Sequence, residues 1–149
     1  MNGVSAERLL RLPVRVRGIE LGRPVDLVLD RRHTRALGLE VLCGDGERRF
    51  LPLAVATVRE SELELRSPLG LLDETELAFY TKRGSTFAAL RGCGVARART
   101  MLGELVDLTL ATDGTIASFV VATADGCEEL DNSADVALVA AGTRIRAAS

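Results

Sequence analysis

Hydrophobic and polar positions alternate along the chain in short runs that are separated by turns. Val25, Leu27 and Leu29 alternate with a second, mostly polar set of residues, and a further apolar run follows at 37–41. Because successive side chains of a strand point to opposite faces, these runs predict strands with one face in a core and the other largely polar. The segment DRRHTR at 30–35 and the pair Asp45-Gly46 then predict hairpin turns.

Two further elements follow in the first half of the chain. RRFLPL at 48–53 reads as a third strand, in which Pro52 predicts a strand end, an edge or a bulge because it has no N–H to donate to a ladder. DETELAFYTKR at 73–83 predicts a helix capped by Asp73 and stopped by Gly84, with acids in its first turn and bases in its last. Its apolar face predicts packing beside the strands.

The chain also repeats itself. LGRPVDLVLD at 21–30 matches LGELVDLTLA at 102–111, which lies 81 residues later. At an offset of 80 the match continues through 34–41 over 114–121, Asp45-Gly46 over Asp125-Gly126, Phe50 over Leu130, 54–58 over 134–138, and ELEL at 62–65 over GTRI at 142–145. Towards the N-terminus, SAERLLR at 5–11 lies over STFAALR at 85–91, so Ser5 and Ser85 are expected to cap equivalent helical turns.

The repeat and the spacing of its turns predict a mainly β protein. Each copy has short strands separated by Gly-containing turns about every ten residues, a pattern typical of a small antiparallel barrel. We therefore expect two tandem small β-barrels with short helical segments. The first is expected at 1–66, a helical connector at 67–92 and the second barrel at 93–149.

The repeated unit resembles the PRC-barrel domain. The likeness rests on L-G-x-x-V-D-L-x-L, a hairpin, a D-G turn and a strand ending F-L-P-L, and it is best over residues 14–65. The second copy keeps LGELVDLTLA and the D-G turn but has ELDNS where FLPL would be. PRC-barrels occur in the reaction-centre H subunit and in the ribosome maturation factor RimM, and the resemblance implies a binding or assembly module without a cofactor.

Composition fits a globular protein in the cytoplasm. The chain has 149 residues, of which 47% are hydrophobic and 27% charged. No apolar run approaches the roughly 18 residues that a membrane-spanning helix needs, and the charged N-terminal segment lacks the apolar core of a signal peptide. Three cysteines without C-x-x-C spacing suit reduced, semi-buried thiols better than a disulfide framework.

No catalytic or metal-binding constellation is evident. His33 is the only histidine, lies in the first hairpin turn and is expected to be an exposed turn residue. Asp26 and Asp107 recur in the two copies; they are expected to accept hydrogen bonds or face solvent, with a carboxylate pair between the barrels as the enzymatic alternative. Gly22 and Gly103 are expected at a tight turn or bulge.

Charge points to protein partners more than to nucleic acid. The net charge is −2, and aromatic residues make up 3% of the chain, which leaves few platforms for base stacking. Our hypothesis is a non-catalytic protein-interaction or assembly module, with self-association as a homodimer left open. The alternative is a ribosome- or RNA-associated maturation factor that uses a basic face of the first barrel, formed by Arg31, Arg32, Arg35, Arg48 and Arg49.

Overall fold

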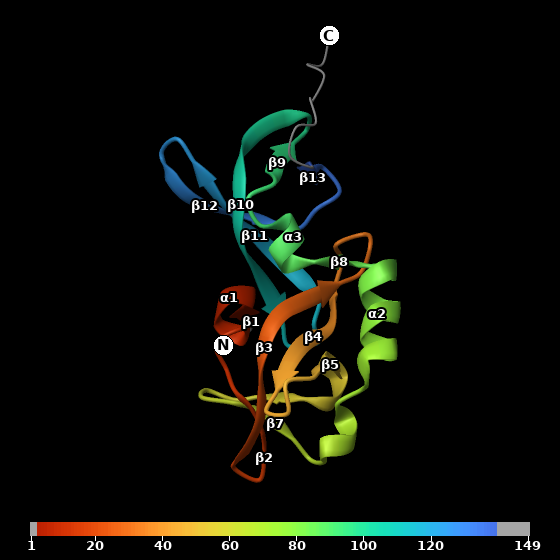
Figure 1. The fold of residues 1–149 in the computed structure, drawn as a ribbon. Coiled ribbons are helices and arrows are strands. Elements are labelled where there is room, and N and C mark those ends of the chain that lie inside the picture. Colours follow the sequence, from red (N-terminus) through yellow and green to blue (C-terminus); the bar gives the residue numbers. More distant parts are fainter. Residues whose placement is uncertain (1–2, 140–149) are drawn as a thin grey trace.

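The computed structural model describes residues 3–139, which form two sheets with short helices (Figure 1). The first sheet has the order β5 (Arg48–Pro52), β4 (Ala36–Cys43), β3 (Ile19–Leu29), β2 (Val14–Val16), β7 (Leu63–Leu65), β6 (Thr57–Val58), with β8 (Ser85–Thr86) also pairing with β3. The second has the order β12 (Gly126–Asp131), β11 (Ile116–Thr123), β10 (Thr100–Ala111), β9 (Gly94–Arg97), β13 (Val136–Val139), with β1 (Gly3–Ser5) also pairing with β10. The mainly β expectation is confirmed.

Closed barrels are not found among the described residues. Each sheet runs as an open path, from β5 to β6 in the first and from β12 to β13 in the second. The helices are α1 (Ala6–Leu9), α2 (Glu74–Arg83) and α3 (Phe87–Leu90), with 3₁₀ turns η1 (Leu53–Val55) and η2 (Pro68–Gly70). The segment expected to connect the copies therefore holds η2 and α2 and also β8 and α3.

The repeat is visible in the irregularities of the strands. Val25 in β3 and Val106 in β10 are both extra residues that have no partner across the ladder. The neighbouring strands β4 and β11 each skip one residue as well, Leu37 and Ala117. Bulges at matching positions bend both hairpins in the same way.

These bulges break the simple alternation that the sequence predicted. Val25 is pushed out of the core face and is 39% exposed, whereas Leu27, Val28 and Leu29 are all buried in succession. Val28 is buried on the opposite face of β3, because it packs against the α2 side of the sheet with Phe50 and Leu77. The expectation of one polar face therefore fails where a helix covers that face.

The third strands match at a different offset from the one expected. In the first copy Leu39 pairs with Leu51, and in the second Phe119 pairs with Leu130. Leu130 therefore corresponds to Leu51 and not to Phe50. The physical reason is the D-G turn, which is one residue shorter in the second copy, where Thr123 pairs directly with Gly126.

The copies diverge after their third strands. Residues 54–58 form part of η1 and the edge strand β6, which pairs with β7, whereas the segment expected to match them forms the start of β13 and pairs with β9. The first copy instead places β7 beside β2, in parallel. The expected match of ELEL at 62–65 to GTRI at 142–145 falls on residues outside those described.

The helix α2 has the bounds and caps that the sequence predicted. Asp73 accepts a hydrogen bond from Glu76 N at 3.1 Å, and the N–H of Gly84 donates to the carbonyl of Tyr80 at 3.0 Å. The ring of Tyr80 stacks on Phe50 of β5, with 4.4 Å between centroids. Leu77 is buried against the same strand, so α2 is fixed to the outer face of the first sheet.

One continuous core joins the two repeats. It combines Leu27 and Leu29 of β3 with Leu108, Leu110 and Phe119 of the second sheet, all at or near complete burial. The two sheets therefore share their apolar interior, although each has its own backbone ladder.

The hairpins β2–β3 and β9–β10 turn through equivalent residue pairs, although the sequences of the two turns are different. Arg17 and Gly18 have φ values of 51° and 80°, and Ala98 and Arg99 have 50° and 69°. Two successive positive φ values define the turn that suits the right-handed twist of a hairpin. The second copy makes this turn without glycine.

Arg99→Gly is expected to raise the free energy of unfolding by about 0.5–1 kcal/mol. The left-handed conformation costs a non-glycine residue roughly 1–2 kcal/mol, and the larger backbone entropy of glycine offsets part of that gain. Gly18→Ala is the reverse control. It should lower the free energy of unfolding because alanine disfavours the positive φ at this position, and no steric clash contributes, since nothing lies within 4 Å of the added Cβ. Urea unfolding measures both, and a loss of stability in Arg99→Gly would contradict the reasoning.

Candidate docking groove between the two repeats

Each repeat sends its N-terminal arm onto the sheet of the other repeat. β1 pairs with β10, with Val4 opposite Leu110, and α1 lies against the same strand. Reciprocally, β8 pairs with β3, with Ser85 opposite Leu29, and α3 lies against β3. In Figure 1 the two arms lie on either side of the junction between the sheets.

The recurring carboxylates Asp26 and Asp107 hold these crossed arms. Asp107 Oδ1 accepts from the N–H of Glu7 in α1 at 3.1 Å, and Asp26 Oδ1 accepts from the N–H of Ala88 in α3 at 3.0 Å. Each also accepts from the N–H of the residue that follows it, at 2.8 Å. Glu7 and Ala88 occupy the same position of their helices, so each carboxylate caps the first turn of the arm that crosses onto its strand.

In the second copy the hydroxyl that caps the helix lies one residue later than the sequence predicted. Ser5 accepts from Arg8 N at 3.1 Å, as the sequence predicted for α1. In α3 the cap is Thr86, which accepts from Ala89 N at 3.3 Å, while Ser85 lies in β8. The offset of the arms is therefore 81, equal to that of the strands on which they pack.

The two hairpin ends meet between the arms through a reciprocal pair of backbone hydrogen bonds. Ala36 N donates to Gly114 O at 2.8 Å, and Ile116 N donates to Thr34 O at 2.9 Å. Because these residues correspond in the repeat, the contact is the same from both sides, as in a twofold dimer interface. Asn132 adds to the junction by donating to His33 O and Ile116 O, each at 3.0 Å.

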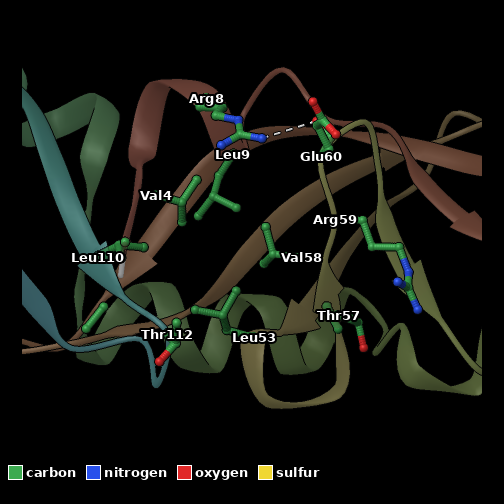
Figure 2. A pocket seen from close by; sticks show the side chains of 13 residues that line it. Val4, Arg8, Leu9, Leu53, Thr57, Val58, Arg59, Glu60, Leu110 and Thr112 are labelled. Atoms are coloured by element: carbon green, nitrogen blue, oxygen red, sulfur yellow. Dashed lines mark hydrogen bonds between the residues drawn. The ribbon is translucent and has the colours of Figure 1, made fainter. Parts of the chain in front are cut away.

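A groove of about 670 Å³ opens beside the first arm (Figure 2). Its apolar lining comes from both repeats and includes Val4, Leu9, Leu53, Val58 and Leu110. Polar groups at its margin are Arg8, Thr57, Arg59, Glu60 and Thr112. A concave surface that combines apolar side chains with several polar groups is typical of a binding site.

Two sheet edges border this groove. β1 pairs only with β10, and β6 pairs only with β7, so each leaves one side of its backbone without a strand partner among the described residues. Arg8 Nη2 donates to the carbonyl of Glu60 at 3.3 Å and ties α1 to the β6–β7 turn at one end of the groove (Figure 2). The remaining length of the groove is open to solvent.

The five arginines of the expected basic face are not brought together. Arg31, Arg32 and Arg35 lie in the β3–β4 turn, next to Ala36 at the start of β4. Arg48 pairs across the ladder with Leu42, near the other end of β4. Six residues of strand separate the two groups, which corresponds to roughly 20 Å.

Both β5 arginines are paired with acids of the same hairpin. Arg48 binds Glu40, and Arg49 makes a two-point contact with Asp45 at 2.8 and 3.1 Å. Hydrogen bonds from Arg49 lower the pKa of Asp45 to about 2. Arg35 donates to the carbonyl of Asp113 at 3.0 Å, which ties the two hairpin ends together. These three arginine side chains therefore already have partners within the fold.

His33 is half-buried, contrary to the expectation of an exposed turn residue. It has a positive φ of 58°, and its Nε2 lies 3.3 Å from Ser85 Oγ of the crossed arm β8. Burial lowers the pKa of its imidazole, partly offset by the negative charge of Asp30. The Asp30 carboxylate accepts hydrogen bonds from Thr34 and Arg35, so it is engaged by the turn itself.

The cysteines and glycines follow their expected roles in part. Cys43 and Cys93 are buried free thiols, while Cys127 is exposed. Gly22 and Gly103 lie beside bulges, and a Cβ at either would come within 2.5 Å of a carbonyl oxygen of the neighbouring strand. Over residues 3–139 no three His, Cys, Asp or Glu side chains gather as a metal site.

Comparison with known proteins adds no assignment. The chain matches no protein-family model and no curated protein. In the part of the chain that the structure describes, no helix has both the length and the apolar character needed to cross a membrane.

The groove could not be predicted from the sequence. Its lining from the first repeat comes mainly from residues 53–60. For this segment the sequence pattern predicts a match to the second copy and no binding site. The one available signal was the apolar side chains of this segment, and in the folded chain Val55 is 48% and Val58 40% exposed. A groove between repeats needs the crossing of the arms, which no local pattern encodes.

Asp107→Ala is expected to lower the free energy of unfolding by about 2 kcal/mol. Two N–H groups, those of Glu7 and Leu108, lose their acceptor, and the second is buried. Asp107→Asn keeps an acceptor oxygen and should lose less. Hydrogen exchange at the Glu7 amide should accelerate in the Ala variant, and unchanged exchange together with unchanged stability would refute the capping role.

Proposed function

We propose that the chain is a non-catalytic protein-binding module that docks an extended segment of a partner protein in the groove between its repeats. The observation that carries the proposal is the apolar groove bounded by the edges of β1 and β6. A partner strand that enters it can place alternate side chains on Val4, Leu53 and Val58, which line the groove and are not fully buried, and its backbone can pair with an open edge.

The open edges favour a peptide over a small apolar molecule. Backbone N–H and C=O groups at a sheet edge are hydrogen-bonding groups that a hydrocarbon ligand leaves unused. Exposed apolar side chains continue outside the groove along η1 and η2, where Leu69 is 87% exposed and Val55 lies near Gly70. A bound segment can therefore bury apolar surface beyond the cavity itself.

The likeness of each repeat to the PRC-barrel domain supports the same role. Both units keep the predicted order of long strand, hairpin, D-G turn and third strand, which is the part of the pattern that carries the resemblance. We propose that they are PRC-like units that open towards each other in place of closing separately. Localisation in the cytoplasm is part of this proposal.

Val58→Arg is expected to weaken peptide binding at least tenfold, because a charge would be placed in an apolar docking site. Peptides selected from a random library on the intact protein supply the ligand, and fluorescence anisotropy gives the dissociation constants. Leu42→Arg is a matched control: Leu42 is 39% exposed against 40% for Val58, and it lies on β4 outside the groove lining.

Selected peptides should carry apolar residues at alternate positions and bind the Leu42 variant like the unmodified chain. Peptides that bind Val58→Arg with undiminished affinity would place the docking surface elsewhere. Failure to enrich any peptide, with RNA binding that weakens in salt and on replacing Arg31, Arg32 and Arg35, would favour the RNA-associated alternative.

A further inference from the structure

A second cavity, of about 390 Å³, occupies the place in the other half of the molecule that corresponds to the groove. Its lining includes Ser85, Ala89 and Leu90 of the second arm, which match Val4, Arg8 and Leu9 of the first at an offset of 81. Arg31 in this cavity matches Thr112 in the groove at the same offset. The fold therefore builds two related cavities from crossed arms.

The two cavities differ in charge. Among the described residues, the second is lined by Arg31, His33 and Arg91 and by no acidic side chain, whereas the groove has Glu60 together with Arg8 and Arg59. Arg91 of the second arm corresponds to Leu10 of the first, so the first arm has no basic residue at that position. The second cavity therefore has the larger excess of basic side chains.

The cationic groups are available to a ligand. Within residues 3–139 neither Arg31 nor Arg91 has a side-chain hydrogen bond or ion pair, and the Arg91 guanidinium lies 5.8 Å from the Phe87 ring centroid, which helps to hold it. Asp30, the acid nearest to His33, is occupied by the N–H groups of its own turn. Ser85 Oγ, next to His33 Nε2, offers a further polar contact.

Part of the cavity is apolar. Leu90 of α3 and Leu138 of β13 line it together with Cys93, whose thiol pKa is raised by burial. A bare ion would leave this wall uncovered, while a ligand with an organic group beside its charge would cover it. The volume is several times that of an isolated phosphate group, so the space allows such a ligand.

We propose that this cavity binds a small phosphate monoester, with the phosphate at Arg31 and Arg91 and its organic group against Leu90 and Leu138. Guanidinium groups match phosphate oxygens in two-point hydrogen bonds. The two positive charges of Arg31 and Arg91 balance a phosphate dianion, whereas a carboxylate ligand would balance only one of them. The site is separate from the peptide groove, so it stands or falls independently of the proposed function.

Phenyl phosphate is the test ligand and His33 is the reporter. Because His33 is the only histidine, its imidazole proton signals in an NMR spectrum need no assignment by mutation. Titration with phenyl phosphate should shift these signals saturably. Arg31→Gln and Arg91→Gln should each weaken the affinity roughly tenfold or more, the effect of losing a charged hydrogen-bond donor.

Arg32→Gln is the matched control, since Arg32 is an exposed neighbour in the same turn and does not line the cavity. It should leave the affinity within about twofold, because its loss changes only the general charge. An equal loss in the Arg31 and Arg32 variants, or the absence of any saturable shift, would overturn the site. Inorganic phosphate should bind more weakly than phenyl phosphate; equal affinity would overturn the role of the apolar wall, and equal binding of neutral benzyl alcohol would overturn the role of charge.

Discussion

The structure depends on one reciprocal contact between its two halves. The backbone of each hairpin end donates to and accepts from the other, through Ala36 with Gly114 and Ile116 with Thr34. Around this contact the arms cross, each capped by the aspartate of the strand on which it packs. In an isologous dimer interface each subunit makes the same contacts to the other, and here the two halves of one chain do so. The shared core, the groove and the cationic cavity all lie around that arrangement.

Twofold construction does not make the two halves alike in their surfaces. Positions that hold the arms are kept, as with Asp26 and Asp107, whereas positions that line the cavities change from Val4 to Ser85 and from Thr112 to Arg31. The core is under a packing constraint that permits few changes. Most of the cavity-wall side chains lie outside the core and are free to diverge, which is how one fold offers two cavities of different charge.

Local elements could be predicted from the sequence because their causes are local. The helix α2 follows from Asp73, Gly84 and the spacing of Leu77 and Tyr80, and the turns follow from their Asp-Gly pairs. The bulge at Val25 has no such local signal, so the pattern predicts an unbroken alternation through β3 that the strand does not have. The placement of the arms could not be predicted either, since pairing β1 with its own repeat or with the other satisfies the same pattern. The cavities depend on that choice.

The crossing of the arms also has a consequence for the synthesis of the protein. The amide of Glu7 finds its acceptor on a residue 100 positions later in the chain. At a translation rate of roughly 5–20 residues per second, the first arm leaves the ribosome about 5–20 s before the strand that holds it. The apolar face of α1, with Ala6 and Leu9, is meanwhile uncovered. The hydrogen bond that caps α1 against β10 can therefore form only after the second half of the chain has been synthesised.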